Sequence, residues 1–168
     1  MIALRLFRKC DFELMRSWAP TPEDVFLFSG SEKNWPLSDR LLESWASSSS
    51  RRAWTCVIEA ESAAIGHIEV VTVGPGHGQL ARVLLAPERR GSGLGRAMVS
   101  AAIDDAVRSG MRTLDLNVID GNQAALATYR GLGFTSLGPN PDHPGMTRMR
   151  LVLETGAPCR PEGATPSL

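Results

Sequence analysis

Residues 83–95 read Val-Leu-Leu-Ala-Pro-Glu-Arg-Arg-Gly-Ser-Gly-Leu-Gly, and the predicted fold is arranged around this stretch. An apolar run ends at Pro87, a basic and glycine-rich turn follows, and the residues from Arg96 open a predicted helix. A strand, a glycine loop and a helix in this order are typical of an anion site. The glycines let the backbone approach the ligand, and the first N–H groups of the helix point at it. Arg89 and Arg90 add positive charge beside this site.

The spacing of the glycines argues against two common phosphate-binding loops. A P-loop has Lys-Ser/Thr after its last glycine, and a dinucleotide fingerprint has G-x-G-x-x-G. Here Gly91, Gly93 and Gly95 alternate, and no Lys-Ser/Thr pair follows them. The pattern that fits is R-x-x-G-x-G, which starts at Arg90. A domain that binds nucleotide phosphates is kept as a weaker alternative.

A second block of sequence lies further along the chain. It reads L-N-V-x-x-x-N-x-x-A-x-x-x-Y-x-x-x-G-F from Leu116 to Phe134. Together with V-x-L-x-P at residues 83–87 and the R-x-x-G-x-G loop, it resembles the acetyl-CoA-binding region of the GNAT superfamily of N-acetyltransferases. The resemblance covers residues 79–135 and has the family's order and separation of motifs.

Length and composition favour a single domain without a nucleic-acid or membrane partner. The chain has 168 residues, enough for one substantial core, and its formal net charge is zero. Cys10, Cys56 and Cys159 form neither a metal-ligand pattern nor a disulfide framework, so no metal is expected. The start has no signal-peptide layout and no apolar run reaches membrane length, which predicts a cytoplasmic protein.

Hydrophobic periodicity predicts an α/β fold in the order β-α-α-β-β-β-α-β-α-β-β. Strands are expected over 2–8, 52–59, 63–73, 78–86, 113–118, 134–137 and 147–153. Helices are expected from Asp11, from Ser38 or Asp39, over 94–109 and over 122–132, with an aromatic-rich connection at 23–35. The resemblance implies a single GNAT-like domain over 1–154, with a mixed central β-sheet and helices on both faces. The Gly/Pro/Ala/Ser-rich residues 155–168 are predicted to be a disordered tail.

The resemblance also implies which residues bind acetyl-CoA, the cosubstrate. The strands at 79–86 and 113–118 would splay apart, and main-chain groups at Val83 and Leu85 would pair with the pantetheine amides. Asn122 would hydrogen-bond the same arm, although it could simply cap the helix that follows. The loop and the helix start would hold the pyrophosphate through Arg90, Gly91, Ser92, Gly93, Leu94, Gly95 and Arg96.

Tyr129, the only tyrosine of the chain, is the predicted proton donor. The family places a tyrosine here that protonates the leaving thiolate; the alternative is a core aromatic on the same helix face as Ala125 and Leu132. The match carries over no general base. Glu69 is preferred for that role on residue type and strand position, ahead of His67, Asp115 and Asn117.

The predicted function is acetyl transfer from acetyl-CoA to a primary amine of a small molecule or a protein/peptide. Direct attack is expected, because no Cys or Ser lies beside a His in a nucleophile pattern. A backbone N–H near Val83 would polarise the thioester carbonyl. Residues 18–45 and 138–146 are expected to select the acceptor, although their aromatic residues favour a core. The alternative is a non-catalytic acyl-CoA-binding regulatory module, which would not need Tyr129. A homodimer is a possible assembly.

Overall fold

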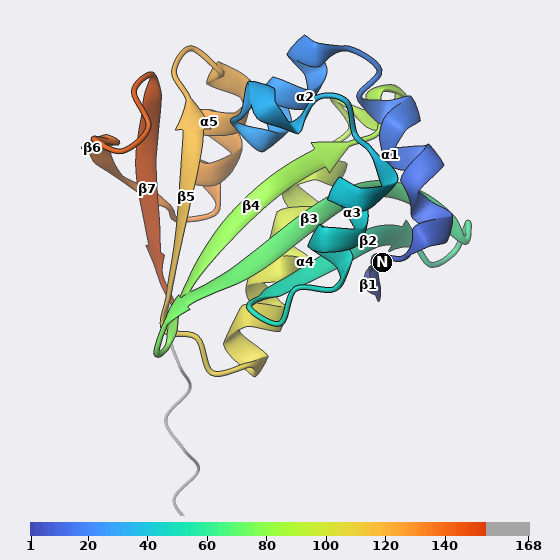
Figure 1. Cartoon of the computed structure of the whole chain (residues 1–168). Helices are drawn as coiled ribbons and strands as arrows, with labels where there is room; N and C mark the ends of the chain where they lie inside the picture. The colour runs from blue at the N-terminus through green and yellow to red at the C-terminus, as the bar shows by residue number, and fades with distance from the viewer. Residues whose placement is uncertain (154–168) are drawn as a thin grey trace, which may run out of the picture.

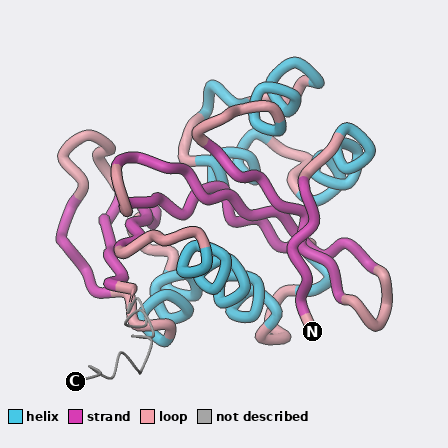
Figure 2. Tube along the Cα trace, turned by 90° about the horizontal axis from the view of Figure 1, so that it is seen from below, coloured by secondary structure: helices cyan, strands magenta, loops and turns pink. Residues whose placement is uncertain are grey.

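The computed structural model describes residues 1–153, in which a mixed β-sheet carries helices on both faces (Figures 1 and 2). The expected tail at 155–168 lies outside the described residues. The strands are β1 (Ile2–Leu6), β2 (Arg51–Ile58), β3 (Ala63–Gly74), β4 (His77–Leu85), β5 (Thr113–Ile119), β6 (Thr135–Pro139) and β7 (Met146–Val152). The helices are α1 (Phe12–Trp18), α2 (Pro22–Ser29), α3 (Asp39–Ala46), α4 (Leu94–Arg108) and α5 (Gln123–Gly131).

The strands follow the order β1-β2-β3-β4-β5-β7-β6, and β4 with β5 is the parallel pair of this sheet. These two strands pair at three positions, from His77 with Thr113 to Gln79 with Asp115. Beyond Gln79 they diverge, which is the splaying that the resemblance implied, and the sheet opens into a V between them (Figure 1). The peptide groups of β4 that face this opening are therefore left without a neighbouring strand.

Two apolar clusters lie on the two faces of the sheet. On one face, α4 packs an apolar stripe against the sheet, with Val99, Ala102 and Ala106 fully buried. On the other face, α1 and α3 bury Met15, Leu42 and other large side chains against the sheet. The aromatic Trp18 is 5% exposed within this second cluster, as the core interpretation expected, whereas Trp35 is 40% exposed and contradicts it.

The prediction of an irregular connection over 23–35 is wrong for its first part, because α2 occupies Pro22–Ser29. Pro22 stands at the first helical position, where its missing N–H is not needed. The Thr21 hydroxyl accepts from the Asp24 N–H at 3.1 Å, and the Asp24 carboxylate accepts from the Thr21 N–H at 3.2 Å. This reciprocal cap starts the helix, and Gly30 ends it with φ 71°.

Asp11 has a larger role than the cap predicted for it. Its carboxylate accepts hydrogen bonds from Arg5 at 2.6 and 3.1 Å, from the Arg8 N–H at 2.9 Å and from the Thr55 hydroxyl at 2.9 Å. No capping bond to α1 forms through its side chain. Burial alone would raise the Asp11 pKa, but these hydrogen bonds outweigh it and hold the pKa below its usual range. The residue ties β1 and β2 to the start of α1.

Within residues 1–153, none of the helices combines the length and the apolar character required to cross a membrane.

Candidate active site

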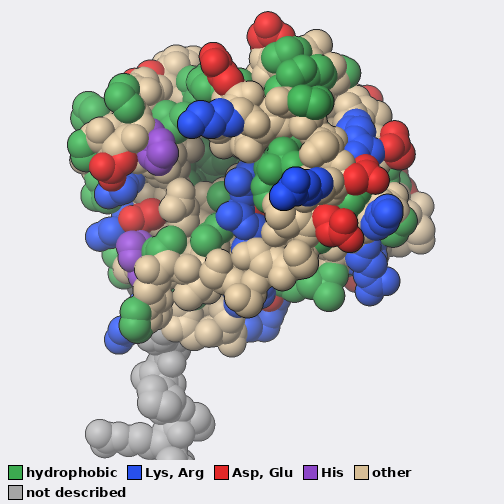
Figure 3. Space-filling view, viewed as in Figure 1, with side chains coloured by type: hydrophobic (Ala, Val, Ile, Leu, Met, Phe, Trp, Pro, Cys, Tyr) green, Lys and Arg blue, Asp and Glu red, His purple; other side chains and the backbone are tan. Residues whose placement is uncertain are grey.

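A cavity of about 770 Å³ lies where β4 and β5 diverge. Its walls come from the second half of β4, the glycine loop with the start of α4, and β5 with α5. The C-terminal end of α2 closes the far side. In the space-filling view this face of the molecule is hollowed, with Lys and Arg side chains gathered around the hollow (Figure 3). The two sequence blocks of the predicted cofactor site thus line one continuous space.

The glycine loop presents unpaired N–H groups to this cavity. Gly91 and Gly93 have φ of 73° and 79°, in the left-handed region that favours glycine, and a Cβ built on either would meet no atom within 4 Å. Gly93 caps α4, and the N–H groups of residues 91–96 contact no acceptor within the described part of the chain. Open space in front of free N–H groups at a helix N-terminus suits an anion such as a pyrophosphate.

Arg90 and Arg96 supply positive charge at the cavity wall. The Arg90 Nε donates to the carbonyl of Leu85 at 3.4 Å, which keeps the side chain near the end of β4. The Arg96 Nη2 donates to the carbonyl of Gly131 at 2.8 Å and links α4 to the end of α5. Both arginines therefore line the cavity beside the glycine loop, and their role in cofactor binding remains a prediction.

Other loop residues lie outside the cavity wall. Arg89 pairs with Glu61 at 2.8 Å and does not line the cavity. The Ser92 hydroxyl donates to the carbonyl of Arg89 at 2.6 Å, and neither Ser92 nor Leu94 lines the cavity. Any contact of these two with the cofactor would come from their backbone N–H groups, and the role remains a prediction.

The second half of β4 contains a bulge at the cavity. His67 pairs with Leu84 and Glu69 with Ala81, so one residue of β3 faces two residues of β4. Within this bulge Arg82 has φ 47°, a conformation that non-glycine residues seldom adopt and that is common at functional sites. Val83 and Leu85 follow and line the cavity, where the predicted pantetheine arm would run.

Tyr129 and Asn122 reach the cavity from α5. The Tyr129 ring is half-buried and packs edge-on against Phe134, with ring centroids 5.7 Å apart. Burial raises the pKa of its hydroxyl to about 12, so the group stays protonated at neutral pH and can act as a donor. The Asn122 Oδ1 accepts from the Ala125 N–H at 3.2 Å. This is the cap that sequence analysis offered as an alternative, and the ligand role of Asn122 stays a prediction.

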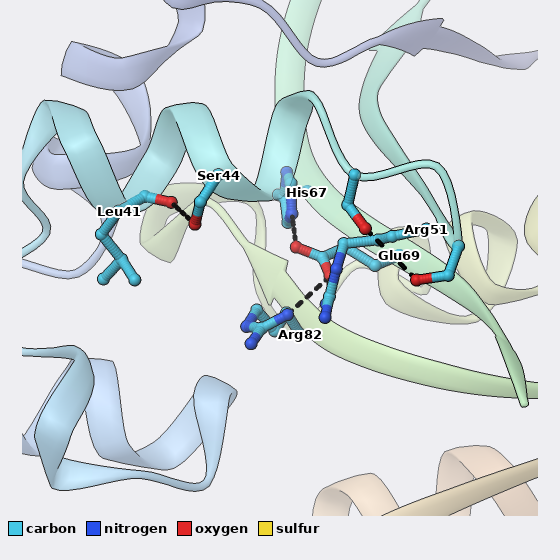
Figure 4. A network of polar contacts seen from close by, with 8 residues as sticks. Leu41, Ser44, Arg51, His67, Glu69 and Arg82 are labelled. Carbon is cyan, nitrogen blue, oxygen red and sulfur yellow. Dashed lines mark hydrogen bonds and ion pairs between the residues drawn. The ribbon is translucent and has the colours of Figure 1, made fainter.

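Glu69 does not line the cavity. Its carboxylate is fully buried and accepts from Arg51 and from Arg82, the latter at 2.7 Å, while the Nε2 of His67 lies 3.0 Å away (Figure 4). Because these neighbours engage both oxygens, its position gives no support to the predicted role of general base. The geometry instead makes Glu69 an anchor for two arginines that do line the cavity.

The other candidates for the general base, which are His67, Asp115 and Asn117, also contact other side chains. His67 is 1% exposed, with its ring 4.5 Å from that of Phe7. Asp115 accepts from Arg150 at 2.6 and 2.8 Å. Asn117 lines the cavity but accepts from the Asn140 side chain at 2.7 Å. None of these side chains is placed as a base by the structure.

Sequence reasoning missed several cavity residues. Arg51 and Arg82 were not singled out as site residues, and neither was His143, which lines the cavity together with Phe28 of α2. A charged residue inside an otherwise apolar strand, as Arg82 is, was the available signal. Arg51 gave none, because only the pairing of β2, β3 and β4 brings it to the site.

Comparison with known proteins assigns a family. The model of the "Acetyltransferase (GNAT) family" matches residues 13–134. A mycothiol acetyltransferase of Kocuria rhizophila is 42% identical over 60 residues, which are 36% of this chain and 20% of that protein. One of Corynebacterium urealyticum is 44% identical over 57 residues, 34% of this chain and 17% of that protein. The matched segment thus spans a fifth or less of the length of these relatives.

Solved structures share the fold. A domain from Methanocaldococcus jannaschii superposes with a TM-score of 0.75 at 18% identity, covering 91% of this chain and 99% of that one. The spermidine N-acetyltransferase from Vibrio cholerae, in complex with CoA and spermine, gives 0.72 at 17% identity, covering 90% and 95%. The ribosomal-protein-S18-alanine N-acetyltransferase from Escherichia coli gives 0.68 at 19% identity, covering 95% and 99%. At these identities the likeness is one of fold.

Proposed function

Because the chain belongs to the acetyltransferase (GNAT) family, we propose that it transfers the acetyl group of acetyl-CoA directly to a primary amine. The observation that carries this proposal is the single cavity that joins the glycine loop at the start of α4 to the opening between β4 and β5. Tyr129 lines the same cavity from α5. One space therefore offers an anion site, an unpaired strand edge and a proton donor.

Binding divides between two parts of the cavity. The N–H groups of residues 91–96, with Arg90 and Arg96, would hold the pyrophosphate. The unpaired peptide groups of β4 at Val83 and Leu85 would hydrogen-bond the pantetheine arm much as an added strand would. Held at both ends, the thioester is fixed in reach of an amine that enters from the other side of the sheet.

The chemistry then requires few groups of the protein. The amine nitrogen forms a bond to the thioester carbon, and the bond from that carbon to sulfur breaks. The Tyr129 hydroxyl, neutral because burial raises its pKa to about 12, donates its proton to the leaving sulfur. The N–H of Val83 would stabilise the developing charge on the carbonyl oxygen. We assign the proton of the amine to a water in the cavity, because the Glu69 carboxylate is already held by Arg51 and Arg82.

The acceptor class is a small amine or a protein/peptide amine. Proteins of the same fold include one named for spermidine and one named for the alanine of ribosomal protein S18. The sequence relatives are named for mycothiol. Acceptors of different size thus occur on this fold, and the cavity walls from α2 would select among them.

The test combines acetyl-CoA binding by calorimetry with thiol release over a panel of small amines and peptides. Gly95→Glu places a carboxylate in the proposed pyrophosphate site, and we expect binding to be lost. Gly95→Ala is the matched control, because its Cβ would meet only the Leu85 Cδ2 at 3.7 Å and binding should persist. Unchanged binding in Gly95→Glu would refute the site. Binding without turnover on any amine would instead favour the non-catalytic acyl-CoA-binding module.

A further inference from the structure

Building on the proposed acetyl transfer, we propose that the acceptor amine also carries a carboxylate group, which Arg51 and Arg82 bind. Both side chains line the cavity, from β2 and β4. They lie on the face of the sheet opposite α4, since Arg82 covers the ring of Trp45 in α3. The pyrophosphate site at the start of α4 is separate, so these arginines belong to the acceptor side.

The charge balance on this wall favours a single negative group. The Arg51 and Arg82 side chains are 20% and 17% exposed, and they share the one carboxylate of Glu69, which is fully buried. Asp24 is the acidic residue among those that line the cavity; it lies in the first turn of α2, where the N–H and the hydroxyl of Thr21 donate to its Oδ2. Two guanidinium groups paired with one buried carboxylate leave one guanidinium without a carboxylate of its own, which a single carboxylate on the acceptor would supply.

The two arginines are held ready to bind such a group. The Arg82 guanidinium lies 4.0 Å from the centroid of the Trp45 ring, and its Nη1 donates to Glu69 at 2.7 Å (Figure 4). Its Nε is buried and has no hydrogen-bond partner within residues 1–153. A guanidinium has five donors in a rigid fork that matches a carboxylate, and only one nitrogen of each arginine is bonded to Glu69. The contacts with Glu69 and Trp45 hold the guanidinium groups in position, and their remaining N–H donors are left for a ligand.

The same wall disfavours two other kinds of acceptor. A polyamine would bring further positive charge next to two partly buried guanidinium groups, which low local dielectric makes unfavourable. A phosphate monoester carries close to two negative charges at neutral pH and would exceed the single charge that Glu69 leaves unmatched. A carboxylate, which is planar and carries one negative charge, fits both the unmatched positive charge and the geometry of the guanidinium donors.

The experiment compares amines that differ only in this group. Glycine with glycinamide, and β-alanine with β-alaninamide, are assayed for thiol release with saturating acetyl-CoA, beside phosphoethanolamine and spermidine. We expect kcat/KM to favour each acid over its amide by about 10- to 100-fold, the effect of a hydrogen bond to a charged group. The amide has the more weakly basic amine, so a preference for the acid cannot come from a larger free-base fraction.

Two matched variants test whether Arg51 causes the preference for the acid. Arg51→Gln should reduce the acid-to-amide ratio by about tenfold. Arg52→Gln is the control, because Arg52 points to the other face, pairs with Asp105 of α4 at 3.0 Å and does not line the cavity. The acid-to-amide ratio is the readout, because partial unfolding would lower the measured rate with both substrates by the same factor. A ratio near one in the wild type, an unchanged ratio in Arg51→Gln, or a preference for phosphoethanolamine or spermidine would overturn the inference.

A binding measurement separates this inference from the proposed function. Calorimetry of each acid and amide on the CoA-saturated protein requires no turnover. Tighter binding of the acids that is lost in Arg51→Gln, without acetyl transfer to any amine, would support the carboxylate site and refute the acetyl-transfer proposal. Acetyl transfer with equal binding of acid and amide would support the acetyl-transfer proposal and refute the carboxylate site.

Discussion

Replacing Tyr129 with Phe removes one oxygen atom and leaves the packing in place. The ring keeps its edge-on contact with Phe134, at 5.7 Å between centroids. Burial alone raises the pKa of the hydroxyl, and no partner within residues 1–153 contributes to that shift. We therefore expect the free energy of unfolding to change by less than about 1 kcal/mol. Affinity for acetyl-CoA should also persist, because the proposed binding groups lie in the glycine loop and β4.

The expected loss is in kcat. A positioned acid contributes roughly 10²–10⁴-fold, which is about 2.7–5.5 kcal/mol of the activation barrier. The loss should fall on kcat because the hydroxyl acts only as the carbon–sulfur bond breaks. The pH dependence has a defined sign. A proton donor with a pKa of about 12 loses activity only as pH rises through that value, so ionisation of Tyr129 should not lower wild-type kcat below about pH 11.

The assay is thiol release under single-turnover conditions with the best acceptor of the panel, so that the chemical step is observed directly. Melting temperature and acetyl-CoA affinity are measured in parallel to verify that only chemistry changes. A Tyr129→Phe protein that transfers acetyl at the wild-type single-turnover rate would show that the tyrosine is a core aromatic. Solvent or the amine itself would then protonate the leaving sulfur.

Three further predictions concern the scaffold. Thr21→Ala removes one side of the cap on α2 and should lower the unfolding free energy by about 1 kcal/mol in denaturant titration. Alanine should destabilise by roughly 1–2 kcal/mol at Gly93, where φ is 79°, yet be neutral or stabilising at Gly95 within α4; thermal unfolding of both variants measures the contrast. The hydrogen bonds from Arg150 lower the Asp115 pKa, so the stability it adds is present above about pH 4 and lost as pH falls further; comparing Asp115→Asn with wild type across pH tests this.

Local signals were enough to predict most of the scaffold. The glycine loop and the helix that follows it are properties of short segments, and both appear where the sequence predicts them. The prediction was wrong at α2, because the aromatic-rich residues 23–35 were interpreted as a connection although Thr21-Pro22-Glu23-Asp24 is a helix start. In that case the sequence contained the signal and it was misinterpreted.

The part of the cavity wall that contains Arg51 and Arg82 could not be predicted in the same way. Arg51, Glu69 and Arg82 lie on three different strands, and only the register of β2, β3 and β4 brings them together. The β4 bulge adds to the difficulty, since it shifts the alternation of side chains near Arg82. Residue type favoured Glu69 as a base, whereas its neighbours in space make it the counter-ion of two arginines.

The divergence of β4 and β5 gives this protein strand edges in its interior as well as at its rim. An unpaired edge is ordinarily an aggregation hazard, because a strand of another molecule can add to it. Here the free edge of β4 faces a cavity lined by α2, α5 and the glycine loop rather than the outer rim of the sheet. A slender extended ligand can still enter. In the proposed function this edge pairs with the pantetheine arm, so amide hydrogen exchange at residues 80–85 should slow when acetyl-CoA binds.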